Sequence, residues 1–210
     1  MANHLSVKKI GFFGGTFDPI HFGHLNLAVN LFEATELDEL IFSPARTSPA
    51  KQDAHPIANA VARKEMIELA IEGFPHFSCI DWELKQEGPS YTIHVIEHLK
   101  EKEPDAMVYL LIGEDALSGL AQWKDVKKLL DLGTFLVGTR LGAVSTLLPP
   151  ILESYLRGSK FPIPTMEISS TVIRQRLAKK KCCNHLVPSK VLDYIEANRV
   201  YSQLDGDQVN

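Results

Sequence analysis

The segment GGTFDPIHFGH, residues 14–24, lies between an apolar run and an amphipathic one. The residues before it, KKIGFF at 8–13, are typical of a strand, and those after it repeat apolar side chains at helical spacing: Leu25, Ala28, Val29 and Phe32. The segment is therefore the turn of a strand–turn–helix unit. It lacks both the GK[ST] ending of a Walker loop and the spacing GxGxxG, so neither common phosphate loop describes it.

Strands and helices alternate along the rest of the chain. Further strands are predicted at 39–43, 76–80, 107–112 and 134–138, and helices at 59–72, from 90 onward, at 116–132, at 145–156, from 169 onward and after Pro188. Such alternation implies right-handed βαβ units, so we predict an α/β fold with a doubly wound parallel sheet. We expect one domain at 1–202 with a short helical C-terminus, and a disordered tail at 203–210.

Composition narrows the class of protein. The 210 residues carry a net charge of −4, which does not suit a chain that tracks a nucleic-acid backbone, so we expect no nucleic-acid partner. No apolar stretch reaches the ~20 residues of a spanning helix, and no secretory signal is evident, so we expect no membrane association and a cytoplasmic location. The neighbours Cys182 and Cys183 lack the spacing of a zinc knuckle, which favours ordinary reduced thiols.

Ligands of a doubly wound sheet bind where its parallel strands end, so the loops that follow strands are the candidate sites. In the first of these loops, Gly14 and Gly15 let the backbone pass close to a ligand. His21 and His24 are three residues apart at the first turn of the next helix, where the helix dipole favours phosphate. One histidine there is equally well explained as a surface or capping residue, but the pair indicates an anion site.

Two motifs at opposite ends of the chain resemble those of one superfamily. Within residues 14–24, positions 15–24 match GxFDPxHxGH, and ISSTVIR at 168–174 matches ISSTxxR. Both resemble the signatures of the nucleotidyltransferases, which transfer a nucleoside monophosphate from a nucleoside triphosphate. Ser169 or Ser170 can cap the second helix, and Arg174 lies one turn further on, within reach of the same anion.

Within this superfamily the chain is most similar to the bacterial nicotinate-nucleotide adenylyltransferases, over residues 8–201. GEDALSGLAQW at 113–123 resembles the family's GxDxLxxLxxW, and SYT at 90–92 resembles its SYT. The resemblance implies that Trp123 stacks on the pyridine ring and that the region of Thr92 holds the nicotinate carboxylate. Taken alone, Trp123 among leucines is better explained as a core residue, so the inference depends on the order of all these segments.

The loop after the second predicted strand departs from the family pattern, which carries PPHK after a proline. It reads PARTSPAK at 44–51, with Ser48 in place of a proline and Ala50 in place of the histidine, whereas Lys51 is retained. The missing imidazole removes one phosphate donor, so the contribution of this loop stays open. Arg140 begins a turn that lacks the proline of the family's RPG.

The resemblance implies that nicotinate mononucleotide attacks the α-phosphorus of ATP, giving nicotinate adenine dinucleotide and pyrophosphate. A phosphate monoester with a second pKa near ~6 is already an anion, so no general base is needed. We expect His21 and His24 to act on the α-phosphate as hydrogen-bond or cationic donors, and Arg174 to hold the β- and γ-phosphates. Lys51 is expected to screen the repulsion between the two substrates.

The expected substrate-binding residues follow from the same motifs. They are Gly14, Gly15, Thr16, Phe17, Asp18, Ser90, Tyr91, Thr92, Gly113, Asp115, Trp123, Arg140, Ile168, Ser169, Ser170 and Thr171. Asp115 is the candidate for the adenosine ribose or base. The expected partners are ATP and nicotinate mononucleotide, with Mg²⁺ held by the triphosphate and water rather than by a protein metal site.

Three alternatives stay open. A pantetheine-phosphate or glycerol-phosphate nucleotidyltransferase would lack the GxDxLxxLxxW and SYT segments. Nicotinamide mononucleotide as acceptor differs from nicotinate mononucleotide by one small group. A nucleotide-binding sensor without chemistry is suggested by Ala50 but disfavoured by the two histidines and Arg174. The sequence also leaves the oligomeric state open, a homo-oligomer included.

Overall fold

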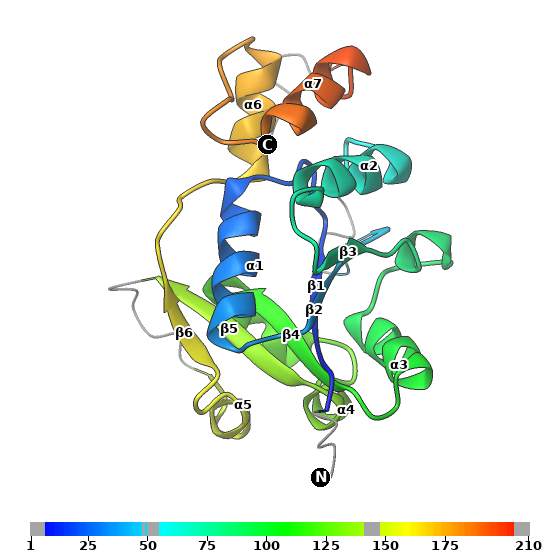
Figure 1. The fold of residues 1–210 in the computed structure, drawn as a ribbon, viewed down its shortest axis with the longest axis vertical. Helices are drawn as coiled ribbons and strands as arrows, with labels where there is room; N and C mark the ends of the chain where they lie inside the picture. The colour runs from blue at the N-terminus through cyan, green and yellow to red at the C-terminus, as the bar shows by residue number, and fades with distance from the viewer. Residues whose placement is uncertain (1–6, 48, 50–54, 141–147, 204–210) are drawn as a thin grey trace, which may run out of the picture.

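The computed structural model describes residues 7–47, 49, 55–140 and 148–203 (Figure 1). Its strands form one parallel sheet in the order β3-β2-β1-β4-β5-β6. The strands are β1 (Lys9–Gly15), β2 (Glu39–Pro44), β3 (Phe77–Cys79), β4 (Met107–Gly113), β5 (Thr134–Arg140) and β6 (Lys160–Ile163). Strand order reverses between β1 and β4, which creates a crevice at their carboxyl ends. The predicted doubly wound sheet is confirmed.

Helices cover both faces of this sheet. They are α1 (Phe22–Ala34), α2 (Ala60–Ile71), α3 (Thr92–Lys102), α4 (Val126–Leu132), α5 (Pro150–Tyr155), α6 (Ser170–Ala178) and α7 (Ser189–Ala197), with 3₁₀ helices η2 (Glu83–Lys85) and η3 (Glu114–Gln122). Figure 1 shows α6 and α7 together at one end of the molecule and α4 and α5 at the opposite end. Within the described part of the chain, every helix is too short or too polar to cross a membrane.

Two apolar cores lie on the two faces of the sheet. On β4, Val108 and Leu110 pack into the core beneath α3, η3, α4 and α5, whereas Leu111 packs into the core beneath α1, α2 and α7. Successive side chains of a strand point to opposite faces, so a strand that is buried on both sides must be apolar throughout. The two cores fix the carboxyl ends of β1 and β4 as a rigid floor.

Three elements differ from those predicted. β6 was not predicted, because its sequence KFPI carries Pro162, which is compatible with a strand at the edge of a sheet but not with a central one. The helix predicted at 116–132 is divided into η3 and α4, because Asp125 adopts a left-handed backbone with φ 51°. Of the helix predicted at 145–156, the structure has Pro150–Tyr155 as a helix (α5), and residues 145–147 lie outside the described residues. Of the tail predicted at 203–210, residues 204–210 lie outside the described residues.

Candidate active site

A cleft of about 460 Å³ opens at the carboxyl ends of β1, β4 and β5. Most of the catalytic and substrate-binding residues that we predicted from the two motifs and from the segment after β4 line this cleft. They are Gly14, Gly15, Thr16, Phe17, Asp18, His21, His24, Gly113, Asp115, Trp123, Ile168, Ser169, Ser170, Thr171 and Arg174. The fold therefore brings the beginning and the end of the chain together at one site.

His21 and His24 cap α1 with each other's side chains. The N–H of His21 donates to Nδ1 of His24, and the N–H of His24 donates to Nδ1 of His21, both at 3.3 Å. The two rings stack with centroids 3.7 Å apart and planes at 17°. Because both Nδ1 atoms accept, a neutral ring carries its proton on Nε2. Each imidazole thus has one N–H left to donate to a ligand.

Burial keeps both imidazoles neutral in the free protein. It lowers the pKa of His21 to about 4, with only 5% of this residue exposed. The pKa of His24 is also far below its usual value, through burial and then through the proximity of His21. Of the two roles predicted for the pair, this environment favours neutral hydrogen-bond donors over cations.

Acid is expected to destabilise the protein through these imidazoles. Their pKa values are lowered by folding, so the stabilisation is present above pH 6.5 and is lost as the pH falls towards 4. Over that range His21 alone should lower the free energy of unfolding by about 3 kcal/mol. Urea unfolding of the wild type and of His21→Asn, which keeps a capping side chain, measures the difference. Parallel pH profiles for the two proteins would contradict this expectation.

The backbone of the signature segment (residues 14–24) is shaped by close packing around aromatic rings. Phe17 adopts a left-handed backbone with φ 49°, and its buried ring packs edge-on against His24 with centroids 5.0 Å apart. A Cβ at Gly15 would lie 2.9 Å from the Phe17 ring, and one at Gly23 would lie 3.1 Å from the His21 ring. Any larger residue at these two positions would displace a ring that shapes the cleft.

Side chains from elsewhere in the fold hold the carbonyl groups of this segment. Arg63 of α2 donates to the Thr16 carbonyl at 2.8 Å, and the hydroxyl of Ser170 donates to the Pro19 carbonyl at 2.9 Å. Arg63 is 1% exposed and also donates to the Ala45 carbonyl at 2.7 Å, which joins the ends of β1 and β2. Sequence reasoning assigned Arg63 no role, because its function depends on contacts that only the fold creates.

Arg174 reaches the signature segment from the first turns of α6. Its Nη1 donates to the Asp18 carbonyl at 2.7 Å and its Nη2 to the Thr171 hydroxyl at 3.2 Å. The Nε–H is buried and has no acceptor, unlike every other buried side-chain nitrogen or oxygen atom of the described residues. An unpaired buried donor costs about 1–3 kcal/mol, so an anionic ligand that supplies an acceptor here would bind favourably.

Asp115 and Trp123 form the wall of the cleft after β4. Asp115 Oδ1 lies 2.5 Å from the place of a Cβ on Gly113, so a larger residue there would displace the Asp115 carboxylate. Trp123 is half-buried at the end of η3, and its ring meets Phe135 edge-on with centroids 6.1 Å apart. Trp123 therefore lies at the border between the core and the cleft, where a ligand can reach it.

No group of three or more His, Cys, Asp or Glu side chains that could hold a metal ion occurs in the ranges that the structure describes. The carboxylate of Asp18 accepts hydrogen bonds from two backbone N–H groups and from the hydroxyl of Tyr201. The Asp18 carboxylate is therefore already occupied by protein donors.

Comparison with known proteins agrees with these features. A model of the cytidylyltransferase-like family matches residues 12–176. A probable nicotinate-nucleotide adenylyltransferase of Bacillus cytotoxicus is 40% identical over 195 residues, which cover 93% of this chain and 99% of that protein. One of Bacillus cereus strain AH820 is 39% identical over 200 residues, with the same coverage. The chain belongs to the nicotinate-nucleotide adenylyltransferase family. The family predicted from the motifs is confirmed.

Solved structures agree with the fold. The nicotinic acid mononucleotide adenylyltransferase of Plasmodium falciparum, complexed with NaAD, has a TM-score of 0.73 at 22% identity and covers 92% of this chain and 97% of its own. The same Plasmodium enzyme complexed with APC has a TM-score of 0.70 at 21% identity, with the same coverage. The Rossmann-like nucleotidyltransferase fold is therefore confirmed independently of the motifs.

Several residues expected from the nicotinate-nucleotide adenylyltransferase pattern are not on the cleft wall. Ser90 accepts a hydrogen bond from the N–H of Arg46 at 2.8 Å, and Tyr91 lies 4.5 Å beneath the Lys124 ammonium group. The segment 90–92 thus lies beside the cleft, between the loop after β2 and the end of η3. Lys51, Ser48 and Ala50 are outside the described residues, as is the side chain of Arg140, whose backbone ends β5.

The sequence did not reveal the part of the cleft wall that is formed by residues 164–166. This loop follows β6 and lines the cleft, and the Pro164 carbonyl accepts from the side chain of Asn26 on α1 at 2.8 Å. The rule that ligands bind at carboxyl ends of strands would have found the loop, but β6 itself was not predicted.

Proposed function

We propose that this cleft transfers the adenylyl group of ATP to nicotinate mononucleotide, giving nicotinate adenine dinucleotide and pyrophosphate. The observation that carries the proposal is the convergence of the paired imidazoles and Arg174 on one cleft. The names of the relatives give the acceptor, a nicotinate nucleotide, and the transferred group, adenylyl. Both substrates are anions, so a site of this kind must concentrate hydrogen-bond donors and positive charge locally in a chain with a net charge of −4.

The chemistry requires positioning more than proton transfer. An oxygen of the nicotinate mononucleotide phosphate forms the new bond to the α-phosphorus, and the bond from that phosphorus to the bridging oxygen breaks as pyrophosphate leaves. The nucleophile is ionised at neutral pH, so no side chain has to remove a proton. The Nε2–H groups of His21 and His24 are suited to stabilise the charge that develops on the α-phosphate oxygens.

The other walls of the cleft are assigned to the β- and γ-phosphates, the adenosine moiety and the pyridine ring. We assign the β- and γ-phosphates to Arg174 and the beginning of α6, where Ser169 caps the helix and accepts from the N–H of Val172 at 3.2 Å. Asp115 is assigned to the adenosine moiety, and Trp123 to the pyridine ring. Lys51 keeps its proposed role of screening the approach of the mononucleotide.

Mg²⁺ is proposed to enter with ATP as its complex. When bound, it would neutralise charge on the triphosphate oxygens. The carboxylates of the cleft wall are Asp18, Glu114 and Asp115, and that of Asp18 is already surrounded by three protein donors. The cleft residues therefore fit a metal held mainly by substrate and water.

Trp123→Ala is expected to raise the KM for nicotinate mononucleotide about tenfold, because a stacking surface for one ring is lost. The KM for ATP should change less than twofold. Steady-state rates with each substrate varied in turn measure both constants. Trp82→Ala is the matched control, because Trp82 stacks on His98 and is not among the residues that line the cleft. Equal effects on the two substrates would assign Trp123 to the core.

Release of pyrophosphate tests the function itself. The protein is mixed with ATP, Mg²⁺ and one acceptor at a time: nicotinate mononucleotide, nicotinamide mononucleotide or pantetheine phosphate. We expect release to be fastest with nicotinate mononucleotide and absent with pantetheine phosphate. Release with pantetheine phosphate alone would indicate another transferase of the superfamily, and no release with any acceptor would indicate a nucleotide-binding sensor.

The cellular setting is proposed from the chemistry of the chain. Cys79, Cys182 and Cys183 are free thiols, which suits a reducing compartment such as the cytoplasm. The absence of a nucleic-acid partner is still a prediction from net charge. The oligomeric state stays open, with a homo-oligomer among the outcomes that a sedimentation measurement would distinguish.

A further inference from the structure

The carboxylate of Asp18 is held behind the signature segment by protein donors, and the residue is 4% exposed. Its Oδ2 accepts from the N–H of Ile57 at 2.8 Å, and its Oδ1 accepts from the N–H of Ala58 at 3.0 Å. A third donor, the hydroxyl of Tyr201, lies 2.8 Å from Oδ1. Because three donors surround it, this carboxylate serves to connect parts of the fold.

Tyr201 brings the C-terminal segment to this point. It follows α7, is 3% exposed and packs its ring in the core beneath α1, α2 and α7. Burial, and then the charge of Asp18, raise the pKa of its phenol. The hydroxyl therefore keeps its proton at neutral pH and remains a donor to the carboxylate.

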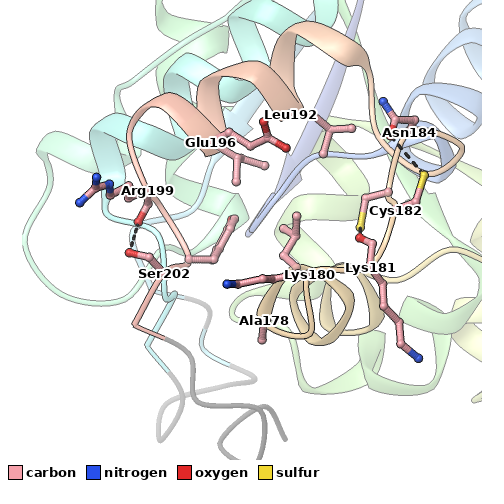
Figure 2. A pocket seen from close by; sticks show the side chains of 13 residues that line it. Ala178, Lys180, Lys181, Cys182, Asn184, Leu192, Glu196, Arg199 and Ser202 are labelled. Atoms are coloured by element: carbon pink, nitrogen blue, oxygen red, sulfur yellow. Dashed lines mark hydrogen bonds between the residues drawn. The ribbon is translucent and has the colours of Figure 1, made fainter.

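A cavity of about 480 Å³ lies beside Tyr201, between the end of α6 and α7. Figure 2 shows Leu192 and Glu196 of α7 on one side of it and Ala178 and Lys180 on the other. Leu177 of α6 and Leu192 of α7 line this cavity and belong to the same apolar core as the Tyr201 ring. The hydrogen bond from Tyr201 to Asp18 adds a polar contact that joins the end of the chain to the signature segment.

Asp18 also contacts Arg174, which lines the cleft. Its carbonyl accepts from Nη1 of Arg174 at 2.7 Å, and its Oδ2 lies 3.9 Å from the same nitrogen. Asp18 also precedes His21 by only three residues. One residue therefore links Tyr201, outside the cleft, to two of the side chains that the proposed reaction uses.

We propose that Tyr201 is a positioning residue for adenylyl transfer, whose hydroxyl fixes Asp18 and, through Asp18, the places of Arg174 and His21. This inference rests on the proposed function. Positioning that matters in the transition state affects kcat more than KM, whereas a loss of folded protein lowers the active fraction and leaves KM and the kcat per active site unchanged.

Tyr201→Phe removes the hydroxyl and keeps the ring. We expect kcat per active site to fall about tenfold, with the KM for nicotinate mononucleotide within about twofold of the wild type. The matched control is Tyr194→Phe, since Tyr194 lies on α7 and is not among the residues that line the cleft. Its kcat should equal that of the wild type. Active sites are counted by titration, and thermal unfolding of each variant verifies that it is folded at the assay temperature.

Hydrogen exchange of the free protein gives a second measurement that needs no substrate. Backbone amides of residues 16–22 should exchange faster in Tyr201→Phe than in the wild type or in Tyr194→Phe. Wild-type kcat in Tyr201→Phe, or unchanged exchange in these amides, would overturn the inference. If the wild type makes no dinucleotide, the proposed function fails instead, so the two failures are told apart by the first assay.

Discussion

His24→Ala is expected to lower kcat about 100- to 1,000-fold, the usual effect of removing one donor aimed at the charge of a transition state. His24 carries a neutral imidazole whose Nδ1 accepts from the N–H of His21. The substitution therefore removes its Nε2–H, the donor proposed for the α-phosphate. An α-phosphate oxygen of ATP carries less charge in the ground state than in the transition state. The dissociation constant for ATP should therefore change only a few-fold.

The helix cap must be separated from the chemistry in this test. His24→Gln places a residue that is common at this capping position and can still accept from the N–H of His21, but lacks the imidazole. It should retain the stability of the wild type and lose kcat as His24→Ala does. His185→Ala removes an exposed histidine and should behave as the wild type. Turnover near wild type in both His24 variants would remove this residue from the mechanism.

Arg174→Ala is expected to reduce kcat/KM for ATP by about 100-fold or more, mainly through KM. The guanidinium is proposed to hold the β- and γ-phosphates, and it also donates to the Asp18 carbonyl. Arg174→Lys keeps the charge but not the fork of donors, so it should recover only part of the loss. Initial rates over a range of ATP concentrations measure both constants.

A neighbouring arginine provides the control for Arg174. Arg176 lies on the same helix, but its Nε and Nη2 donate to the Cys182 carbonyl at 3.1 and 2.8 Å, away from the cleft. Arg176→Ala should therefore leave the KM for ATP unchanged. Equal losses in the two alanine variants would mean that α6 needs its positive charge for stability, and that Arg174 does not contact ATP.

The strands that form the floor of the cleft could be predicted from the sequence because their signals are local. β1 and β4 are short apolar runs that end in glycine, and the rule for parallel sheets places the residues after them in one crevice. β6 could not be predicted because a proline in a short run argues against a strand unless that strand lies at the edge of a sheet. Which strand lies at an edge depends on the whole sheet and cannot be read from a local segment.

The chemical state of the site residues depends on contacts that the sequence does not display. The motif identified His21 and His24, but their neutrality follows from burial and from the reciprocal bonds of the cap. Asp18 was expected to contact substrate, and it does lie on the cleft wall. Its carboxylate, however, is occupied by Tyr201 and by the backbone of Ile57 and Ala58 just before α2, which are distant in sequence.

The fate of isotopic label from ATP tests adenylyl transfer most directly. The wild-type protein is incubated with nicotinate mononucleotide, Mg²⁺ and ATP labelled with ³²P on either the α- or the γ-phosphate, and the products are separated. We predict that the α-label appears in the dinucleotide and the γ-label in pyrophosphate, in equal amounts. Transfer of the γ-label to the mononucleotide, or recovery of all α-label as ATP, ADP or AMP, would contradict the account.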